Sequence, residues 1–256
     1  MLDDSETMYH IGLTSADAAG AELAIICGDP GRVEKIARLA DEPAFVGQKR
    51  EYTTWSAKVG GKRILITSHG IGGPSTAICV EELSQIGIRT MIRVGTCGGM
   101  NQKVLPGDAV IASAAIRAEG TSKEYLPIEF PAAADFDVTL ALRDAAASLG
   151  IPNHVGVVQC KDSFYGQHAP ERMPVASELL YKWNAWLAGG CLASEMESST
   201  LYCVGAVLGL KTGCVLHVCW NQERAKAGIT DPEPADPMNA AKIAMEAARR
   251  LTANGQ

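Results

Sequence analysis

The chain has 256 residues, of which 47% are hydrophobic and 20% are charged, and its net charge is −6. These proportions describe a globular protein that can bury a sizeable core. The acidic balance argues against a general nucleic-acid binder or a binder of acidic membranes, since either needs a basic face. The acidic start MLDDSETMYH and the short apolar runs predict neither a signal peptide nor a membrane span.

The predicted elements alternate between strands and helices along the chain. The predicted strands cover 22–27, 51–59, 62–70, 90–99, 107–116, 153–160 and 212–219, the second and third forming a hairpin. The predicted helices cover 28–40, 74–87, 135–150, 195–210 and 236–252. This alternation favours an α/β fold with a mostly parallel or mixed sheet covered by helices, in one domain that spans 1–256.

The cysteines lie mostly among apolar residues, which is typical of buried reduced thiols in a cytosolic protein. The examples are Cys27, Cys160, Cys203, Cys214 and Cys219. There is no CxxC pair, and the five histidines are scattered without metal-ligand spacing. We therefore expect a cytoplasmic protein without a zinc site.

Two glycine-containing turns could hold an anion. CGDPGR (27–32) follows a strand and opens a helix, where backbone N–H groups and Arg32 favour a phosphate. On this stretch alone, a simple turn capped by Asp29 is the more common arrangement. RVGTCGG (93–99) places Arg93 in an apolar strand and Thr96 at its end, and a structural pair between the arginine and a carboxylate is equally compatible.

KDSFYGQHAPER (161–172) combines aromatic side chains with a carboxamide. Aromatic rings stack on a planar heterocycle, and an amide offers it one donor and one acceptor side by side. The alternative is a polar loop that Phe164 and Tyr165 anchor to the core.

LASEMESSTLYCVGAVLGL (192–210) carries two carboxylates and no lysine or arginine to pair with them. Glu197 could accept from both hydroxyls of a ribose diol, since a carboxylate has two acceptor oxygens. Alternatively, Glu195 and Glu197 complement the dipole at the start of a helix. The segment alone leaves both interpretations open.

In chain order, GDPGR, GIGGPS, RVGTCGG, FYGQ and SEMES closely resemble the uridine phosphorylases, within the hexameric-type nucleoside phosphorylases. The resemblance runs from YHIGL (9–13) to the last helix. It implies a single three-layer α/β/α domain with a central mixed, twisted sheet. It also implies a homo-oligomer, expected to be a hexamer, whose active sites are completed across a dimer interface.

The implied activity is phosphorolysis of uridine, or of a close pyrimidine nucleoside, to free base and ribose 1-phosphate in pyrimidine salvage and catabolism. Inorganic phosphate is the co-substrate, and no cofactor is implied. The alternatives are a purine-nucleoside phosphorylase of the same superfamily, a hydrolase that uses water, and a nucleoside-binding protein without turnover.

The resemblance also assigns residues to roles, with Arg93, Glu197 and Gln167 as the catalytic ones. It implies phosphate binding by Gly28, Arg32, Arg93 and Thr96, with Arg50 from the neighbouring subunit. It implies ribose binding by Glu195, Met196 and Glu197, with His10 from the neighbour. It places Cys97, Gly98, Phe164 and Gln167 around the base. Glu51, Ile71 and Ser75 match positions that hold a potassium ion in some members.

The chain departs from the familiar pattern at the base. Ala169 stands where the family has an arginine, so either Arg172 or His168 would serve the base instead. Asn221 stands where the purine branch has a proton-donating aspartate, which favours a pyrimidine. Gln222 replaces a further arginine, and the segment 222–237 is expected to form a mobile loop that closes over the base.

Overall fold

The computed structural model describes residues 6–232 and 236–253. The strands are β1 Leu23–Cys27, β2 Asp41–Lys49, β3 Tyr52–Val59, β4 Lys62–Ser68, β5 Thr90–Gly99, β6 Ala109–Ala118, β7 Ala132–Ala133, β8 Asn153–Lys161, β9 Ala193–Glu195 and β10 Lys211–Asn221. The helices are α1 Ser15–Ala18, α2 Pro30–Ala37, α3 Gly73–Gln85, α4 Thr121–Tyr125, α5 Phe136–Ser148, α6 Phe164–His168, α7 Ala176–Ala188, α8 Ser198–Val207, α9 Gln222–Lys226 and α10 Asn239–Ala253, with a 3₁₀ turn at Pro170–Arg172.

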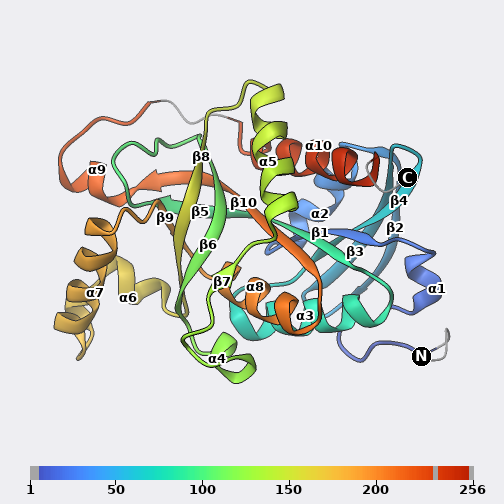
Figure 1. The fold of residues 1–256 in the computed structure, drawn as a ribbon, viewed down its shortest axis with the longest axis horizontal. Helices are drawn as coiled ribbons and strands as arrows, with labels where there is room; N and C mark the ends of the chain where they lie inside the picture. The colour runs from blue at the N-terminus through green and yellow to red at the C-terminus, as the bar shows by residue number, and fades with distance from the viewer. Residues whose placement is uncertain (1–5, 233–235, 254–256) are drawn as a thin grey trace.

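Helices cover both faces of one mixed sheet (Figure 1). The apolar residues of α3 and α8 pack with one face, and those of α2, α5 and α10 pack with the other. The expected α/β fold with a mixed sheet and surrounding helices is therefore confirmed.

Local sequence explains the element boundaries near the site. The five residues of β1 are all buried, as in a strand covered by helices on both faces. Asp29 then ends the extended backbone and accepts a hydrogen bond from Gly31 N at 2.8 Å, while Pro30 occupies the first turn of α2. This is a favourable helix start because it satisfies a free N–H group and needs no N–H from proline.

The sheet closes on itself at one end, which the sequence did not indicate. Strand β5 pairs with β10 in parallel, and the path continues through β6, β8 and β9 back to the end of β5. On its other edge, β5 pairs with β1 only as far as Val94, and β9 takes over at Gly98. The three residues between them, Gly95–Cys97, therefore lie where the sheet divides, a position at which open α/β sheets bind ligands.

Several elements differ from the sequence-based prediction. Strand β2 was not predicted, because it is an edge strand whose side chains are mostly exposed and which lacks a regular apolar alternation. Helix α7 was also missed. Helix α8 begins at Ser198 rather than at Glu195, because Ala193–Glu195 form strand β9.

The segment after β10 is not simply a loop. It begins with helix α9, and Arg224 of that helix forms an ion pair with Asp231 at 2.6 Å. The expectation of an irregular loop over 222–237 is therefore wrong for its first part, while the mobility of the segment stays a prediction. Residues 233–235 lie outside the described residues. Within the described ranges, no helix is long and apolar enough to cross a membrane.

Candidate active site

A cavity of about 850 Å³ opens where the sheet divides. Six residues expected at the phosphate and the sugar line it, namely Gly28, Arg32, Arg93, Thr96, Met196 and Glu197. Six residues expected at the base or the pocket wall also line it, namely Cys97, Gly98, Phe164, Gln167, His168 and Glu195. The fold thus brings together twelve residues from distant parts of the chain.

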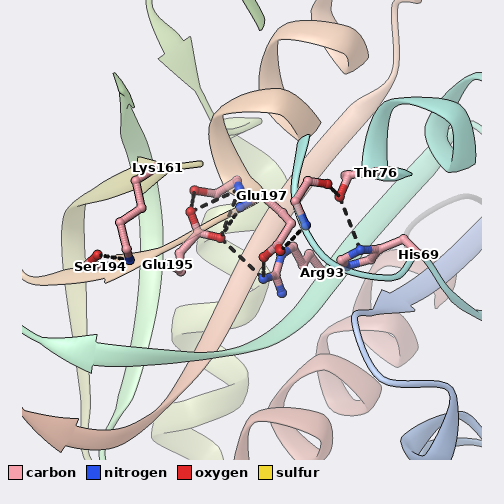
Figure 2. A network of polar contacts seen from close by, with 9 residues as sticks. His69, Thr76, Arg93, Lys161, Ser194, Glu195 and Glu197 are labelled. Carbon is pink, nitrogen blue, oxygen red and sulfur yellow. Dashed lines mark hydrogen bonds and ion pairs between the residues drawn. The ribbon is translucent and has the colours of Figure 1, made fainter. Parts of the chain in front are cut away.

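Arg93 is buried and lines this cavity, and Figure 2 shows its side chain beside Glu197. It folds back over Gly95, where an added Cβ would lie only 2.0 Å from Arg93 Nη1. Arg93 Nη2 donates to Glu197 and lies 3.4 Å from Glu195 Oε2. Arg93 Nε and Nη1 meet no hydrogen-bond partner among the described residues. A buried guanidinium with unused donors is a ready site for an oxyanion.

The two carboxylates of SEMES have different roles. Glu195 accepts from the backbone N–H groups of Glu197 at 2.9 Å and Ser198 at 3.0 Å, and from the Ser198 hydroxyl. It therefore caps the first turn of α8 from inside the protein. Glu197 accepts from Gly72 N at 2.7 Å and from Arg93, so it joins the start of α3 to the centre of the cavity.

The electrostatics keep this pair ionised. Burial alone raises the pKa of Glu197, but the positive charge of Arg93 and the hydrogen bonds from Gly72 and Arg93 together outweigh it, and the pKa is lower than usual. Burial alone lowers the pKa of Arg93, but the negative charges of Glu197 and Glu195 and the hydrogen bond to Glu197 act together against it, and the pKa rises. The site therefore holds a positive and a negative side chain next to each other, both buried.

His69 belongs to the same cluster, although the sequence analysis did not assign it a role. It is fully buried, and its Nδ1 lies 3.2 Å from Thr76 Oγ1 (Figure 2). Thr76 Oγ1 already donates to Gly72 O at 2.9 Å, so His69 Nδ1 is the donor to Thr76. Burial, reinforced by Arg93, lowers the pKa of His69 to about 3, and the ring is therefore neutral.

At the base end of the cavity, Lys161 was also missed by the sequence analysis. Its side chain is buried, and Nζ donates to Ser194 Oγ at 2.6 Å (Figure 2). Burial lowers the pKa of Lys161, while Glu195 partly opposes this shift. No carboxylate of the described residues lies within 4.0 Å of Lys161 Nζ. The available signal was a lysine at the end of an apolar strand, immediately before the aromatic motif.

Aromatic side chains form the outer wall of this end. The rings of Phe164 and His168 lie 4.3 Å apart between centroids, and those of His168 and Trp220 lie 5.7 Å apart. Gln167 is buried beneath them and contacts Ser194 and Gln222. Aromatic rings beside a carboxamide suit a planar base.

Three of the expected site residues lie outside the cavity of this chain. His10 contacts Glu82, with Nδ1 at 2.6 Å from Glu82 Oε1, and Arg50 lies 6.0 Å from the ring of Tyr9. Arg172 lies in the 3₁₀ turn after α6. Of the two alternatives for the base, His168 lines the cavity and Arg172 does not.

Comparison with known proteins shows the family of this chain. The family described as the phosphorylase superfamily matches residues 22–254. A uridine phosphorylase of Treponema pallidum is 51% identical over 95% of this chain and 93% of its own, and that of Escherichia coli is 44% identical over 95% and 98%. A guanosine phosphorylase of Halorubrum lacusprofundi is 39% identical over 91% and 92%. The chain belongs to the phosphorylase superfamily. The family suggested by the ordered motifs is thus confirmed.

Within the phosphorylase superfamily, the position of Asn221 bears on the kind of base. Its side chain is fully buried and donates to Asn101 O and Val104 O, both at 2.8 Å. Its Oδ1 caps α9 through Glu223 N and Arg224 N. Both ends of this amide are therefore occupied by the scaffold, so Asn221 is not available to a base in the cavity.

The expectation for the cysteines needs one correction. All eight are free, and seven are buried, but Cys219 is exposed and lines the cavity. The reason is an irregularity in the pairing of β10 with β5 between Val218 and Trp220, which turns the Cys219 side chain away from the core.

Proposed function

We propose that the protein cleaves uridine with inorganic phosphate to give uracil and ribose 1-phosphate, a reaction of pyrimidine salvage and catabolism. The observation that carries this proposal is the buried Arg93 guanidinium in the cavity wall. One of its nitrogens binds Glu197, and the other two have no hydrogen-bond partner among the described residues. Its relatives among the uridine phosphorylases support the choice of nucleoside.

Phosphate binds at the free donors of Arg93, between Arg32, Thr96 and the turn at Gly28. The turn at Gly28 packs closely against the backbone of Gly70, since a Cβ on Gly28 would lie 3.1 Å from Gly70 O. The guanidinium groups of Arg32 and Arg93 and the start of α2 supply positive potential for the anion. They hold the phosphate under C1′ of the sugar, which supplies proximity and orientation.

Ribose binding then separates the central ion pair. Phosphate takes over as the partner of Arg93, and Glu197 accepts from the 2′ and 3′ hydroxyls, next to Met196. As the bond between C1′ and the base nitrogen breaks, its electron pair goes to the base, and a phosphate oxygen forms the new bond to C1′. The negative phosphate stabilises the positive charge that develops on the sugar.

The base end stabilises the leaving group. Negative charge develops on the carbonyl oxygens of the departing pyrimidine, and Lys161 offers a buried positive charge without a carboxylate within ion-pair distance among the described residues. Gln167 forms hydrogen bonds with the edge of the base, and Phe164 and His168 cover its face. Cys97 and Gly98 form part of the pocket wall. No protein nucleophile takes part in this mechanism.

A purine nucleoside is the second candidate substrate, because a guanosine phosphorylase is among the relatives. The buried and fully bonded Asn221 argues against it, since the base lacks an acid at that position. A binding protein without turnover is disfavoured by the coexistence of the phosphate donors and the sugar acceptor in one cavity.

We further propose that the chain is one domain over 1–256 and acts in the cytoplasm as a homo-oligomer, specifically a hexamer. His10 and Arg50 support the shared interface of this oligomer, because they do not line the cavity of their own chain and would complete the cavity of a neighbouring subunit. A dimer and a hexamer both supply such an interface. Arg50 would add to the phosphate site and His10 to the 5′ end of the ribose. The free cysteines are compatible with a reducing compartment.

A potassium ion at Glu51, Ile71 and Ser75 remains a proposal. Ser75 Oγ donates to Glu51 Oε1 at 2.9 Å, and all three residues line the same edge of the cavity. Oxygen ligands of this kind suit a hard monovalent cation. Thermal unfolding in potassium chloride should then occur at a higher temperature than in choline chloride of equal ionic strength.

The first experiment measures free base released from uridine, thymidine and inosine, each with and without phosphate. The proposal expects uracil from uridine only when phosphate is present. Hypoxanthine from inosine would favour the purine candidate, and release without phosphate would indicate a hydrolase. No release from any nucleoside would contradict the enzyme proposal.

A further inference from the structure

Ser194 and Gln222 hold the carboxamide of Gln167 from both sides. Ser194 Oγ donates to Gln167 Oε1 at 2.7 Å, and Gln167 Nε2 donates to Gln222 Oε1 at 3.0 Å. All three side chains are buried, so water does not compete freely for these bonds. Lys161 Nζ donates a hydrogen bond to Ser194 Oγ, so the serine hydroxyl can donate its own hydrogen bond to a different acceptor.

The proton of Ser194 and the amide of Gln222 together determine which way Gln167 points. Ser194 Oγ also contacts Gln159, but a hydroxyl has only one proton. In the structure Gln159 presents its Oε1 to Ser194, as Gln167 does. With the single proton directed to Gln167, the Gln159 amide must be turned so that its nitrogen faces Ser194. If Gln167 turned alone, its oxygen would face Gln222 Oε1 with no proton between them. A reversal of Gln167 therefore requires Gln222 to turn with it.

A carboxamide held in one direction can distinguish uracil from cytosine. Uracil presents an N–H donor at N3 beside a carbonyl acceptor at C4, whereas cytosine presents an acceptor at N3 beside an amino donor at C4. An amide that pairs with one of these edges places donor against donor and acceptor against acceptor on the other. Sites that pair polar groups in this way reject a mismatched analogue strongly.

We propose that Ser194 and Gln222 are positioning residues that fix the direction of the Gln167 carboxamide and thereby exclude cytidine. This inference rests on the proposed function and adds to it the residues that determine base specificity. Gln222 stands where the familiar family pattern has an arginine, so the arrangement is a property of this chain's own residues.

The test compares the inhibition constant of cytidine with the KM of uridine, because binding of cytidine can be measured even if its base does not leave. Gln222→Met keeps the length of the side chain and removes its hydrogen bonds, whereas Gln222→Glu keeps an acceptor for Gln167 Nε2. We expect Gln222→Met to lower the ratio of the two constants about tenfold, as for one buried hydrogen bond, and Gln222→Glu to stay near wild type.

If Gln222 had a merely structural role, its substitution would weaken the binding of cytidine and of uridine by the same factor and leave this ratio unchanged. An unchanged ratio in Gln222→Met, or equal ratios in the Met and Glu variants, would overturn the proposal. Thermal unfolding checks that each variant is folded, and Ser194→Ala, which should also lower the ratio, provides the same readout if neither variant folds. If the wild type releases no uracil, the proposed function fails. Calorimetry of uracil and cytosine binding to these variants then still tests whether Ser194 and Gln222 fix the direction of the Gln167 carboxamide.

Discussion

Gly95→Ala tests whether the position of Arg93 is essential to the site. A Cβ at residue 95 would lie 2.0 Å from Arg93 Nη1, 2.7 Å from Arg93 Cζ and 2.8 Å from Leu216 Cδ2. The guanidinium must therefore move by roughly 1 Å or more to restore van der Waals contact. Misplacing a group in a reaction centre by about 1 Å can reduce the rate by about 10²-fold. We expect a fall of that order in kcat/KM and a clear rise in the KM for phosphate.

The assay is phosphorolysis of uridine at varied phosphate, with thermal unfolding measured in parallel because overpacking can cost about 1–3 kcal/mol of stability. Gly120→Ala is the matched control, since its new Cβ would meet its nearest neighbour, Asp162 Oδ2, at an ordinary 3.6 Å. A Gly95→Ala enzyme that binds phosphate within twofold of wild type would show that Arg93 does not act from this position.

Three further predictions concern charge and access at the site. Because burial lowers the pKa of His69 to about 3, the unfolded chain binds a proton there that the native protein does not, so stability should fall as pH drops from 6.5 toward 3. The loss is about 2 kcal/mol by pH 5, and urea unfolding of His69→Asn should show a weaker pH dependence than wild type. Glu197→Ala should raise the KM for uridine at least about tenfold more than the KM for phosphate. Arg93→Ala should instead raise the KM for phosphate more than the KM for uridine. Equal effects on both constants would contradict the assigned roles. Iodoacetamide should label Cys219 alone in the native protein, and slowly, because partial burial of its thiol in the cavity wall raises the pKa. Phosphate with uridine should protect it, and labelling of a fully buried thiol at the same rate would contradict the described cavity.

Much of the site could be anticipated because short motifs carry local chemistry. The sequence CGDPGR contains both the strand end and the helix start that the structure has, with Asp29 as the cap. The choice between anion binding and a structural ion pair at Arg93 could not be made locally. In the structure Arg93 pairs with Glu197, and its Nε and Nη1 have no partner among the described residues, so the ion pair leaves donors for an anion.

The sequence by itself determined the family, the α/β class and most residues of the cavity, because these depend on ordered motifs and on apolar periodicity along the chain. Only the tertiary structure explained how the glutamates of SEMES are held, since Arg93 lies 104 residues from Glu197. The burial of His69 and Lys161, and the bonds that lock Gln167, also appear only after the sheet closes through β9. Such features depend on strand order and on which side chains exclude water together, and neither is encoded in any one stretch of sequence.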